Sequence, residues 1–440
     1  MNRFEKQITG IFPSTVGNMC FLADGFSFTI MDNQIEPLRR VEIEPQDSFL
    51  RGKTRDGYDI GVYIGNHNAE VYGVYRCETG AYVVSINNMD KTDISDYYGI
   101  EFVGGTLNKL YRPHFKNFGV DEQEDEKIEF SIIVHDITIQ IEIGYSIIFD
   151  RQKEEHTNEE AVYCRMTFLS AQNLGSFFQH YNALKELISF MAYRQNVGFD
   201  DIYLLSQPKI INGIEYQNHL AAMFIYYDNP LTEKDSFTCI HFHEIKPSLA
   251  SFLTLLYNNE ERKPLYSSGY IPQDDHDAFR MTNSKVREIC SAIECELYHV
   301  QVCDGAIDSN LRELIDSVKE RIKEHQNSDK CLPDKMYNNI YGSLQNWDIP
   351  ASERIIALYQ KHEGNVVNIR PVHFFMNNTS IEEFIKYRND ITHGRYRQLN
   401  KSIAKTGFAL IGLIYCCVLS RIGLNKETID NISKKPRLLS

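Results

Sequence analysis

The stretch IEFSIIVHDITIQIEI, residues 128–143, decides how the first half of this chain folds. Its second part alternates isoleucine with polar residues in a strict period of two: Ile137, Thr138, Ile139, Gln140, Ile141, Glu142, Ile143. That period is typical of a strand with one face on a core and the other toward water. His135 and Asp136 separate it from a second apolar run, so the stretch predicts a β-hairpin.

Strand patterns continue on both sides of this hairpin. Further strands are predicted at 26–30, 60–64, 82–86, 162–168, 202–205, 221–227 and 237–242. Between them, residues 176–193 follow a helical period, with one apolar stripe of Phe177, Tyr181, Leu184, Ile188 and Met191. The middle of the chain therefore mixes α and β structure, and we expect it to complete the N-terminal sheet.

From Pro247 onward the pattern is helical. Helices are predicted at 286–300, 311–322, 334–344, 351–361, 381–393 and 399–422. The expected fold class is α+β, with a β-rich N-terminal region, a mixed α/β middle and an all-α C-terminal bundle. We place the boundary between residues 1–245 and residues 246–440.

The composition is that of an ordinary globular protein, with 42% hydrophobic and 24% charged residues in 440. The longest apolar run, residues 407–419, is short for a membrane span and indicates a buried helix. No signal-peptide pattern opens the chain, and the ten cysteines form no CxxC pair. We therefore expect a cytoplasmic protein without disulfides and with no membrane partner.

Charge is distributed unevenly along the chain. The net charge is −14, but residues 381–440 hold eleven Lys or Arg against five acids, a net +6 that leaves −20 for the rest. A local positive field on an acidic body can hold a polyanion at one place only. A solvated helix face with a basic tail explains the same numbers equally well.

The basic segment contains a helix with an unusual stripe. Thr379 with Glu382, and Ser380 with Glu383, have the spacing of a capping box, and Gly394 is placed to end the helix. The apolar stripe Ile381, Phe384, Ile385 next reaches position 388, which is arginine. Burying an arginine is costly without a partner, so a structural anion on a neighbouring helix is one explanation. A catalytic site is the other.

Arg388 and His393 are suited to cutting RNA, which carries its own nucleophile in the 2′-hydroxyl. Histidine titrates near neutral pH and can act as base or acid, and arginine supplies a planar cation for phosphate oxygens. Asn389 would orient the histidine or bond a phosphate, and no metal or other cofactor is needed. The flanking basic residues would hold the RNA backbone, and Tyr387 or Tyr396 would stack a base: Lys386, Arg395, Arg397, Lys401 and Lys405.

The spacing of the pair favours a dimer. Five residues turn an ideal helix by about 140°, so Arg388 and His393 of one chain point apart. Two such helices paired across a two-fold axis would bring two arginines and two histidines into one cleft.

The stretch YRNDITHG, residues 387–394, resembles the signature of the HEPN superfamily: arginine, a polar residue, and histidine after four to six residues. The resemblance covers roughly residues 270–430 and implies a HEPN helical bundle. The order of the two regions looks like the ApeA-type proteins of bacterial anti-phage defence. It implies a homodimeric, metal-independent endoribonuclease, with Arg388 and His393 catalytic and Asn389 in support. The substrate implied is host RNA, tRNA first, and the implied partner is a phage-encoded trigger or inhibitor.

Other interpretations compete with this one. HEPN-like domains also act as binding or antitoxin-type modules without cutting, and a β-rich carbohydrate-binding protein with a helical dimerisation domain is a third class. His241 and His243, two apart on a predicted strand with Glu244 nearby, are more simply surface residues than a metal site. Glu294 and Glu296 are expected on a solvated helix face. The acidic segment 121–126 is expected to be an exposed loop, and the basic segment 434–437 a disordered tail.

Overall fold

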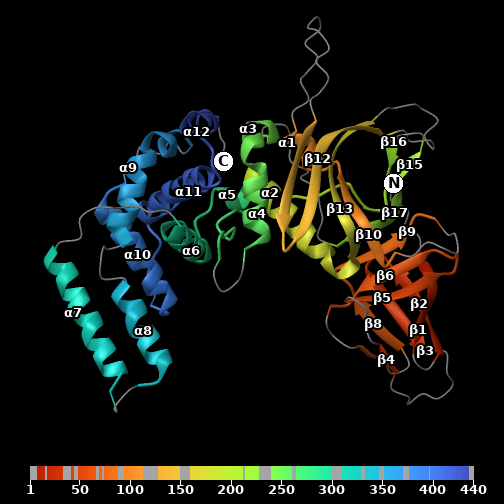
Figure 1. The fold of residues 1–440 in the computed structure, drawn as a ribbon, viewed down its shortest axis with the longest axis horizontal. Helices are drawn as coiled ribbons and strands as arrows, with labels where there is room; N and C mark the ends of the chain where they lie inside the picture. The colour runs from red at the N-terminus through yellow and green to blue at the C-terminus, as the bar shows by residue number, and fades with distance from the viewer. Residues whose placement is uncertain are drawn as a thin grey trace, which may run out of the picture. The chain divides into compact units, whose positions relative to one another are not determined.

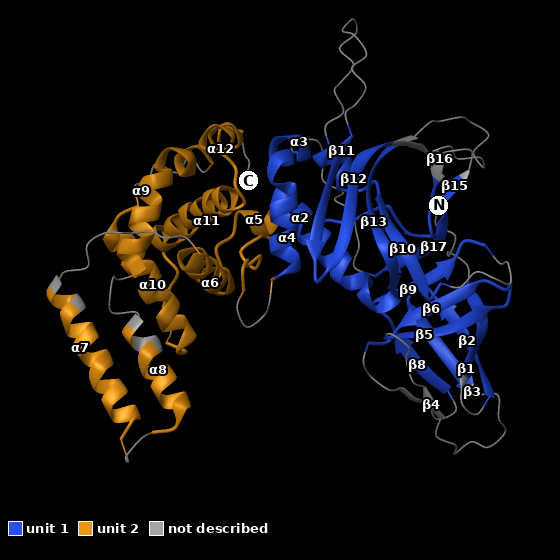
Figure 2. Ribbon diagram, in the orientation of Figure 1, with its two compact units in different colours: residues 1–258 blue, residues 259–440 orange. Residues whose placement is uncertain are grey.

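The fold is described from a computed structural model of the chain. It covers residues 7–14, 17–32, 41–43, 48–65, 69–71, 74–87, 94–111, 127–148, 159–211, 214–226, 239–259, 264–299, 309–328, 332–345, 351–369, 376–395 and 397–435. Two compact units are distinguished, residues 1–258 and residues 259–440 (Figure 2). This division lies after α3 (Phe242–Ile245) and α4 (Leu249–Tyr257), whereas the expected boundary lay between them. Helix α4 packs on strand β11 of the sheet, a contact that local sequence does not reveal.

Unit 1 is built on one antiparallel sheet of thirteen strands, in the order β11-β12-β13-β10-β14-β17-β9-β6-β5-β1-β2-β3-β8 (Figure 1). Its strands are β1 (Ile8–Ser14), β2 (Gly17–Asp24), β3 (Ser27–Asp32), β5 (Phe49–Thr54), β6 (Asp59–Tyr63), β8 (Val74–Glu78), β9 (Ala81–Ser85), β10 (Asp96–Val103), β11 (Ile128–Val134), β12 (Ile137–Ile148), β13 (Glu159–Asn173), β14 (Asp201–Leu205) and β17 (His219–Ile225). Two small two-stranded sheets pair β4 (Val41–Ile43) with β7 (Ala69–Val71) and β15 (Lys209–Ile211) with β16 (Ile214–Tyr216).

The hairpin predicted from residues 128–143 is confirmed. Strands β11 and β12 pair from Val134 with Ile137 to Ile128 with Ile143. The two turn residues, His135 and Asp136, both have positive φ, as a two-residue turn matched to the strand twist requires. The strand predicted at 237–242 is wrong in its described part, because residues 239–241 form no strand and Phe242 begins α3. Residues 237 and 238 lie outside the described residues.

The described residues of unit 1 include two large apolar regions. One gathers aromatic and aliphatic side chains from the β1, β2, β3, β5, β6 and β9 end of the sheet, including Phe12, Phe21 and Phe28. The other lies under α2 (Phe177–Ala192) and α4, next to the isoleucines of β12. The short elements α1 (Leu107–Leu110), η1 (Leu174–Ser176) and η2 (Lys246–Ser248) complete the unit. The polar residues between the β12 isoleucines therefore point to the opposite face of the sheet.

His180 is a buried histidine in this second core. Its Nδ1 lies 2.9 Å from the hydroxyl of Tyr257, and its Nε2 has no hydrogen-bond partner among the described residues. Burial disfavours the charged ring and lowers the pKa of His180 to about 4 from the usual 6.5.

We expect this histidine to make unit 1 sensitive to acid. A folded-state pKa below the unfolded value contributes stability that is complete above about pH 6.5 and is lost as the pH falls toward 4. His180→Gln should therefore flatten the fall in unfolding free energy between pH 7.5 and 4.5, by on the order of 3 kcal/mol. Urea unfolding followed by circular dichroism measures this. The exposed His276→Gln is the control, and an unchanged pH dependence in His180→Gln would contradict the assignment.

Unit 2 is helical. Its helices are α5 (Asp275–Ala278), α6 (Asn283–His299), α7 (Ser309–Gln326), α8 (Asp334–Gln345), α9 (Ala351–Ile369), α10 (Asn378–Thr392), α11 (Lys401–Arg421) and α12 (Lys426–Ser433). Helices α6, α9, α10 and α12 all pack against α11, and α7 packs against α8. The six helices predicted for this region are confirmed, and the fold class is α+β. Most ends are shifted by a few residues, but α9 continues eight residues beyond its predicted end at 361.

Helix α11 is the core of unit 2. Fourteen of its residues are buried, including Cys416 and Cys417, as expected for the apolar run 407–419. Within the described part of the chain, it is the one helix long and apolar enough to cross a membrane, and 78% of its apolar window is buried inside the structure. Core helices meet the same criterion of length and composition.

Candidate active site

The candidate site lies on α10. This helix begins at Asn377, whose side chain accepts a hydrogen bond from the amide of Ser380 at 2.9 Å, while Ser380 bonds back to the amide of Asn377. Both capping boxes predicted from Thr379 and Ser380 are therefore wrong, because the helix starts earlier. Asparagine is among the preferred residues at this position, because its side-chain oxygen accepts from an otherwise unpaired N–H of the first turn.

One face of α10 is buried: Ile381, Phe384, Tyr387 and Ile391. Tyr387 donates from its hydroxyl to the side-chain oxygen of Asn283 on α6, at 2.7 Å. Its ring is fully buried, so the expectation that Tyr387 stacks a base is wrong. Tyr396, the other candidate for stacking, lies outside the described residues. The apolar stripe thus continues through position 387, and Arg388 lies at its border.

Arg388 is held by an anion on the neighbouring helix. Its side chain is 27% exposed and forms an ion pair with Glu294 of α6. Its Nη1 also donates to the side-chain oxygen of Asn389 at 3.1 Å. Glu294 is 58% exposed, so the pair is reachable by solvent. The structural anion considered as an explanation for Arg388 is therefore present, and it is Glu294. The side chain of Asn389 helps to orient the arginine.

Cys290 lies on α6 beside the same arginine. Burial raises the pKa of its thiol to about 12, and the guanidinium of Arg388 opposes this only in part. The thiol is therefore protonated at neutral pH and is no nucleophile.

His393 closes the helix at its C-terminal end. Its amide donates to the carbonyl of Asn389 at 3.0 Å, and Gly394 follows with φ of +71°, a conformation that glycine adopts without strain. Arg287 of α6 donates to the carbonyl of Ile391 at 2.8 Å and fixes this end. The imidazole of His393 is exposed. No hydrogen bond or ring contact joins it to Arg388 within the described ranges.

The predicted RNA-binding residues differ in how available they are. Lys386 and Lys401 are exposed, and Arg395 is 76% exposed with a long ion pair of 3.6 Å to Asp390. Arg397 is 31% exposed, pairs with Asp390 at 3.3 Å and lies over the ring of Tyr387. The structure therefore leaves Lys386, Arg395 and Lys401 open to a ligand, while Arg397 stabilises the helix end.

Two other sequence candidates are placed elsewhere. Glu296 is not solvated as predicted: it is buried and bonds Arg421 of α11 through both carboxylate oxygens, at 2.7 and 3.1 Å. Burial raises its pKa to about 7, and Arg421 offsets this only in part. His241 and His243 are not on a strand, because His241 caps α3 and His243 lies within it. No cluster of three metal-ligating residues occurs in the described segments.

If Arg388 binds a phosphate, Glu294 would compete with it, because the two side chains form an ion pair. We expect Glu294→Gln to tighten binding of RNA, lowering KM about two- to fivefold, because a half-exposed ion pair is worth at most about 1 kcal/mol. Steady-state cleavage kinetics measure this, with Glu288→Gln on the same helix as the matched control. A KM that rises or stays constant would show that Glu294 instead positions the arginine for its role.

Comparisons with known proteins found no significant match. No protein-family model, curated protein or solved structure matches this chain significantly. The functional assignment therefore depends on the residues and geometry of the site.

Proposed function

We propose that this protein is a metal-independent endoribonuclease of the HEPN type that cuts host RNA, tRNA first, during anti-phage defence. Arg388 and His393 form the catalytic pair, with Asn389 in support. The observation that carries the proposal is the placement of His393. Its imidazole is exposed, its backbone amide is bonded at the helix end, and the same part of the chain carries the exposed cations Lys386, Arg395 and Lys401.

The chemistry follows from those groups. His393 takes the proton of the 2′-hydroxyl or supplies one to the leaving 5′-oxygen, and the Arg388 guanidinium stabilises the charge on the phosphate. The reaction forms a bond from the 2′-oxygen to phosphorus and breaks the bond to the 5′-oxygen. Its products are a 2′,3′-cyclic phosphate and a 5′-hydroxyl.

The proposal requires a homodimer. Within one chain, Arg388 contacts α6 and His393 lies about 140° further round the helix. A second copy of α10 would supply the missing partner for each residue, so one composite site would contain two arginines and two histidines. Phosphate would then compete with Glu294 for each arginine.

The β-rich unit would act as the sensor or restraint. An RNA-cutting enzyme that is always active would kill its own host, so a phage-encoded trigger or a partner protein is expected to control it. The cytoplasm is the compartment in which both the RNA and the trigger would be met.

A specific observation favours a second function. Glu294 already satisfies Arg388, as a purely structural arginine would be satisfied. This supports a non-catalytic binding module of the antitoxin type, in which α10 contacts a partner and cuts nothing.

Incubation of the purified protein with tRNA, in the presence and absence of a chelator, separates these functions. The enzyme should cleave equally with and without EDTA, since histidine and arginine need no metal. Cleavage that stops in EDTA would contradict the proposed chemistry. Absence of cleavage by protein purified from infected cells would favour the binding module.

A further inference from the structure

Unit 1 has a polar cluster of its own, separate from the candidate site on α10. It lies on the face of the sheet opposite to α2 and α4. Phe168 and Met166 of β13 face those helices: the Phe168 ring contacts the His180 ring at a tilt, and Met166 accepts a hydrogen bond from Tyr257. Their neighbours along the strand, Arg165 and Thr167, therefore face the other side. The strand register extends this face across β12 and β11.

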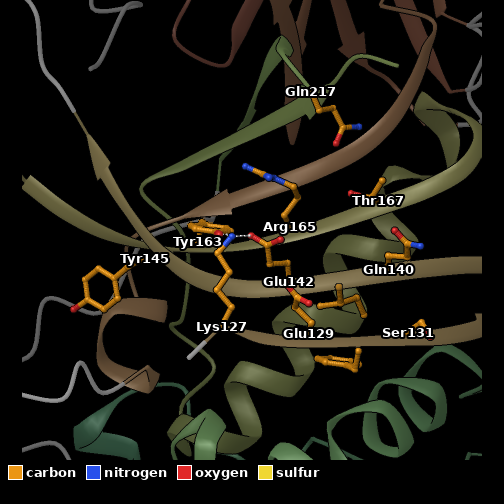
Figure 3. A pocket seen from close by; sticks show the side chains of 12 residues that line it. Lys127, Glu129, Ser131, Gln140, Glu142, Tyr145, Tyr163, Arg165, Thr167 and Gln217 are labelled. Atoms are coloured by element: carbon orange, nitrogen blue, oxygen red, sulfur yellow. Dashed lines mark hydrogen bonds and ion pairs between the residues drawn. The ribbon is translucent and has the colours of Figure 1, made fainter. Parts of the chain in front are cut away.

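The register arranges the polar side chains in two rows. Thr167 pairs with Gln140, and Gln140 pairs with Ser131; in the next row Arg165 pairs with Glu142, and Glu142 with Glu129. Strand spacing separates neighbours within a row by about 4.8 Å, and the two rows lie about 6.8 Å apart. Figure 3 shows these side chains rising from the strands into one open cleft. The cleft has a volume of about 820 Å³, within the range of small-molecule sites.

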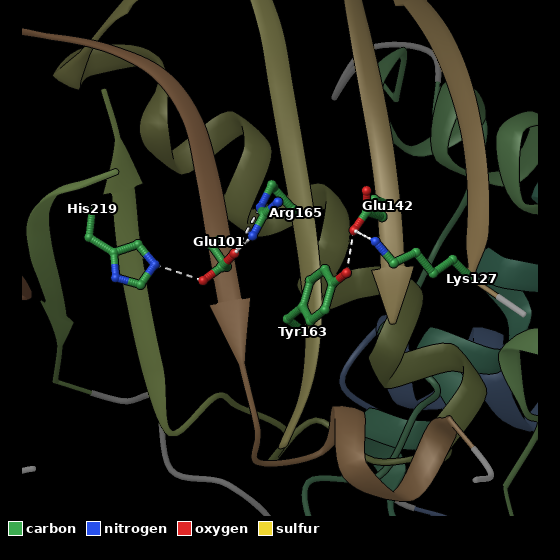
Figure 4. Close-up of polar contacts among 6 residues, drawn as sticks. All are labelled: Glu101, Lys127, Glu142, Tyr163, Arg165 and His219. Atoms are coloured by element: carbon green, nitrogen blue, oxygen red, sulfur yellow. Dashed lines mark hydrogen bonds and ion pairs between the residues drawn. The ribbon is translucent and has the colours of Figure 1, made fainter. Parts of the chain in front are cut away.

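Ion pairs hold the charged groups of this cleft in place (Figure 4). Glu101 of β10 accepts from Arg165 Nε at 2.8 Å and from Nη2 at 2.5 Å, and from His219 at 2.8 Å. Glu142 accepts from the hydroxyl of Tyr163 and from Lys127 at 3.0 Å. Glu101 and Glu142 are therefore each paired with a cation before any ligand arrives, whereas Glu129 has no ion pair among the described residues.

Both carboxylates remain ionised despite their surroundings. Burial acts to raise the pKa of Glu101, but the hydrogen bond from His219 and the charge of Arg165 bring the pKa below its usual value. Burial also acts to raise the pKa of Glu142, and the bonds from Tyr163 and Lys127 bring it below the usual value. The cleft therefore presents ionised acceptors at neutral pH.

Hydrogen-bonding groups remain free beside these pairs. The side chains of Ser131, Gln140 and Thr167 have no hydrogen-bond partner among the described residues. Within the same ranges, Oε2 of Glu142 and Nη1 of Arg165 also have none. A Cβ at Gly144 would lie 3.0 Å from the Tyr163 hydroxyl oxygen, so glycine at this position leaves room for the hydroxyl that bonds Glu142. Free donors and acceptors thus alternate along a compact surface.

The charge balance decides which ligands suit this surface. Two cations, Lys127 and Arg165, face two lining carboxylates, Glu129 and Glu142, and Glu101 adds a third behind them. An anion would have to displace Glu101 from Arg165 against repulsion from three carboxylates, which disfavours acidic ligands. A neutral ligand leaves both ion pairs intact and uses the free groups.

We propose that this cleft binds a neutral ligand through adjacent hydroxyl groups, either a saccharide or the ribose of a nucleoside without phosphate. A carboxylate oxygen accepts from such hydroxyls, as acidic residues do toward ribose. Ser131, Gln140 and Thr167 bond the neighbouring hydroxyls, and the distance between the two rows matches a ligand of more than one ring. The site goes beyond the proposed RNA cleavage and does not depend on it.

The test measures binding to the full-length chain with two sets of probes, oligosaccharides and nucleosides. Calorimetry and a glycan array measure binding of neutral and acidic oligosaccharides in one arm. The other arm compares the four nucleosides with their 5′-monophosphates. The test variant is the double substitution Gln140→Leu and Thr167→Val, both on the solvent face. The matched control is Thr138→Val, the same change on the same face of β12 but outside the cleft lining. Thermal melting checks that each variant folds.

The proposal predicts binding of a neutral probe by the parent and by Thr138→Val. The double variant should bind it at least about tenfold more weakly, as expected for two lost hydrogen bonds. Whether the oligosaccharides or the nucleosides bind shows which of these two kinds of ligand the cleft takes. Three results would each overturn the proposal: no neutral probe binds, only phosphorylated or acidic probes bind, or binding is equal in the double variant.

Discussion

Replacement of His393 by alanine is expected to abolish RNA cleavage without unfolding the protein. The imidazole is exposed at the end of α10 and makes no recorded side-chain contact within the described residues, so its loss costs the fold little. General acid–base catalysis by a positioned histidine typically contributes 10²- to 10⁴-fold, and we expect a loss of about that size. Cleavage of labelled tRNA by the purified variant measures it, with the melting temperature determined in parallel.

The control for this variant is His276→Ala, an exposed histidine of α5 in the same unit. It should cut at the rate of the parent protein. Arg388→Ala should lose a comparable factor, and Arg388→Lys should rescue little because lysine lacks the planar pair of donors. A His393→Ala protein of verified purity that cuts at the parent rate would remove His393 from the mechanism.

Mixing the two inactive variants is expected to restore cleavage. In a dimer of one Arg388→Ala chain and one His393→Ala chain, the composite site keeps the arginine of one chain and the histidine of the other. We expect activity to rise roughly tenfold or more above either variant alone, because acid–base and phosphate contacts are both present again. Co-expression with two different affinity tags isolates the mixed dimer for the assay.

The control is the double variant carrying both substitutions, mixed with itself, which should remain inactive. If the mixed dimer is as inactive as its parents while the wild-type dimer is active, Arg388 and His393 act within one chain. The dimeric site would then be wrong although the ribonuclease assignment would stand.

Local patterns in the sequence predicted most elements of the fold. The isoleucines of β12 alternate with polar residues because one face of the strand is buried. The turn at His135 and Asp136 needs only two residues. Both features can therefore be predicted from a short stretch of sequence. The order of the thirteen strands in the sheet cannot be predicted in this way, because it depends on pairings such as β17 with β9, between residues far apart in the chain. The small helix α3 was mistaken for a strand because a four-residue element shows no helical period.

The sequence predicted which residues belong to the candidate site, but it did not predict which residues they contact. Gly394 marked the helix end correctly, and Arg388 lies beside the buried stripe. Its partner Glu294 is 94 residues away in sequence, so only packing of α10 on α6 brings the two together. Glu296 was taken as solvated because its burial depends on Arg421 of α11. The cleft of unit 1 was missed, although Gln140, Glu142, Arg165 and Thr167 alternate with apolar residues on two paired strands.

The chemistry of the RNA ends produced in cells tests the central proposal most directly. RNA from cells expressing the parent protein is sequenced by a method that distinguishes 2′,3′-cyclic phosphate from 3′-hydroxyl ends, and compared with RNA from cells expressing His393→Ala. The account predicts new tRNA ends with 2′,3′-cyclic phosphate in the parent sample and none in the variant. New ends bearing a 3′-hydroxyl, or identical ends in both samples, would contradict it.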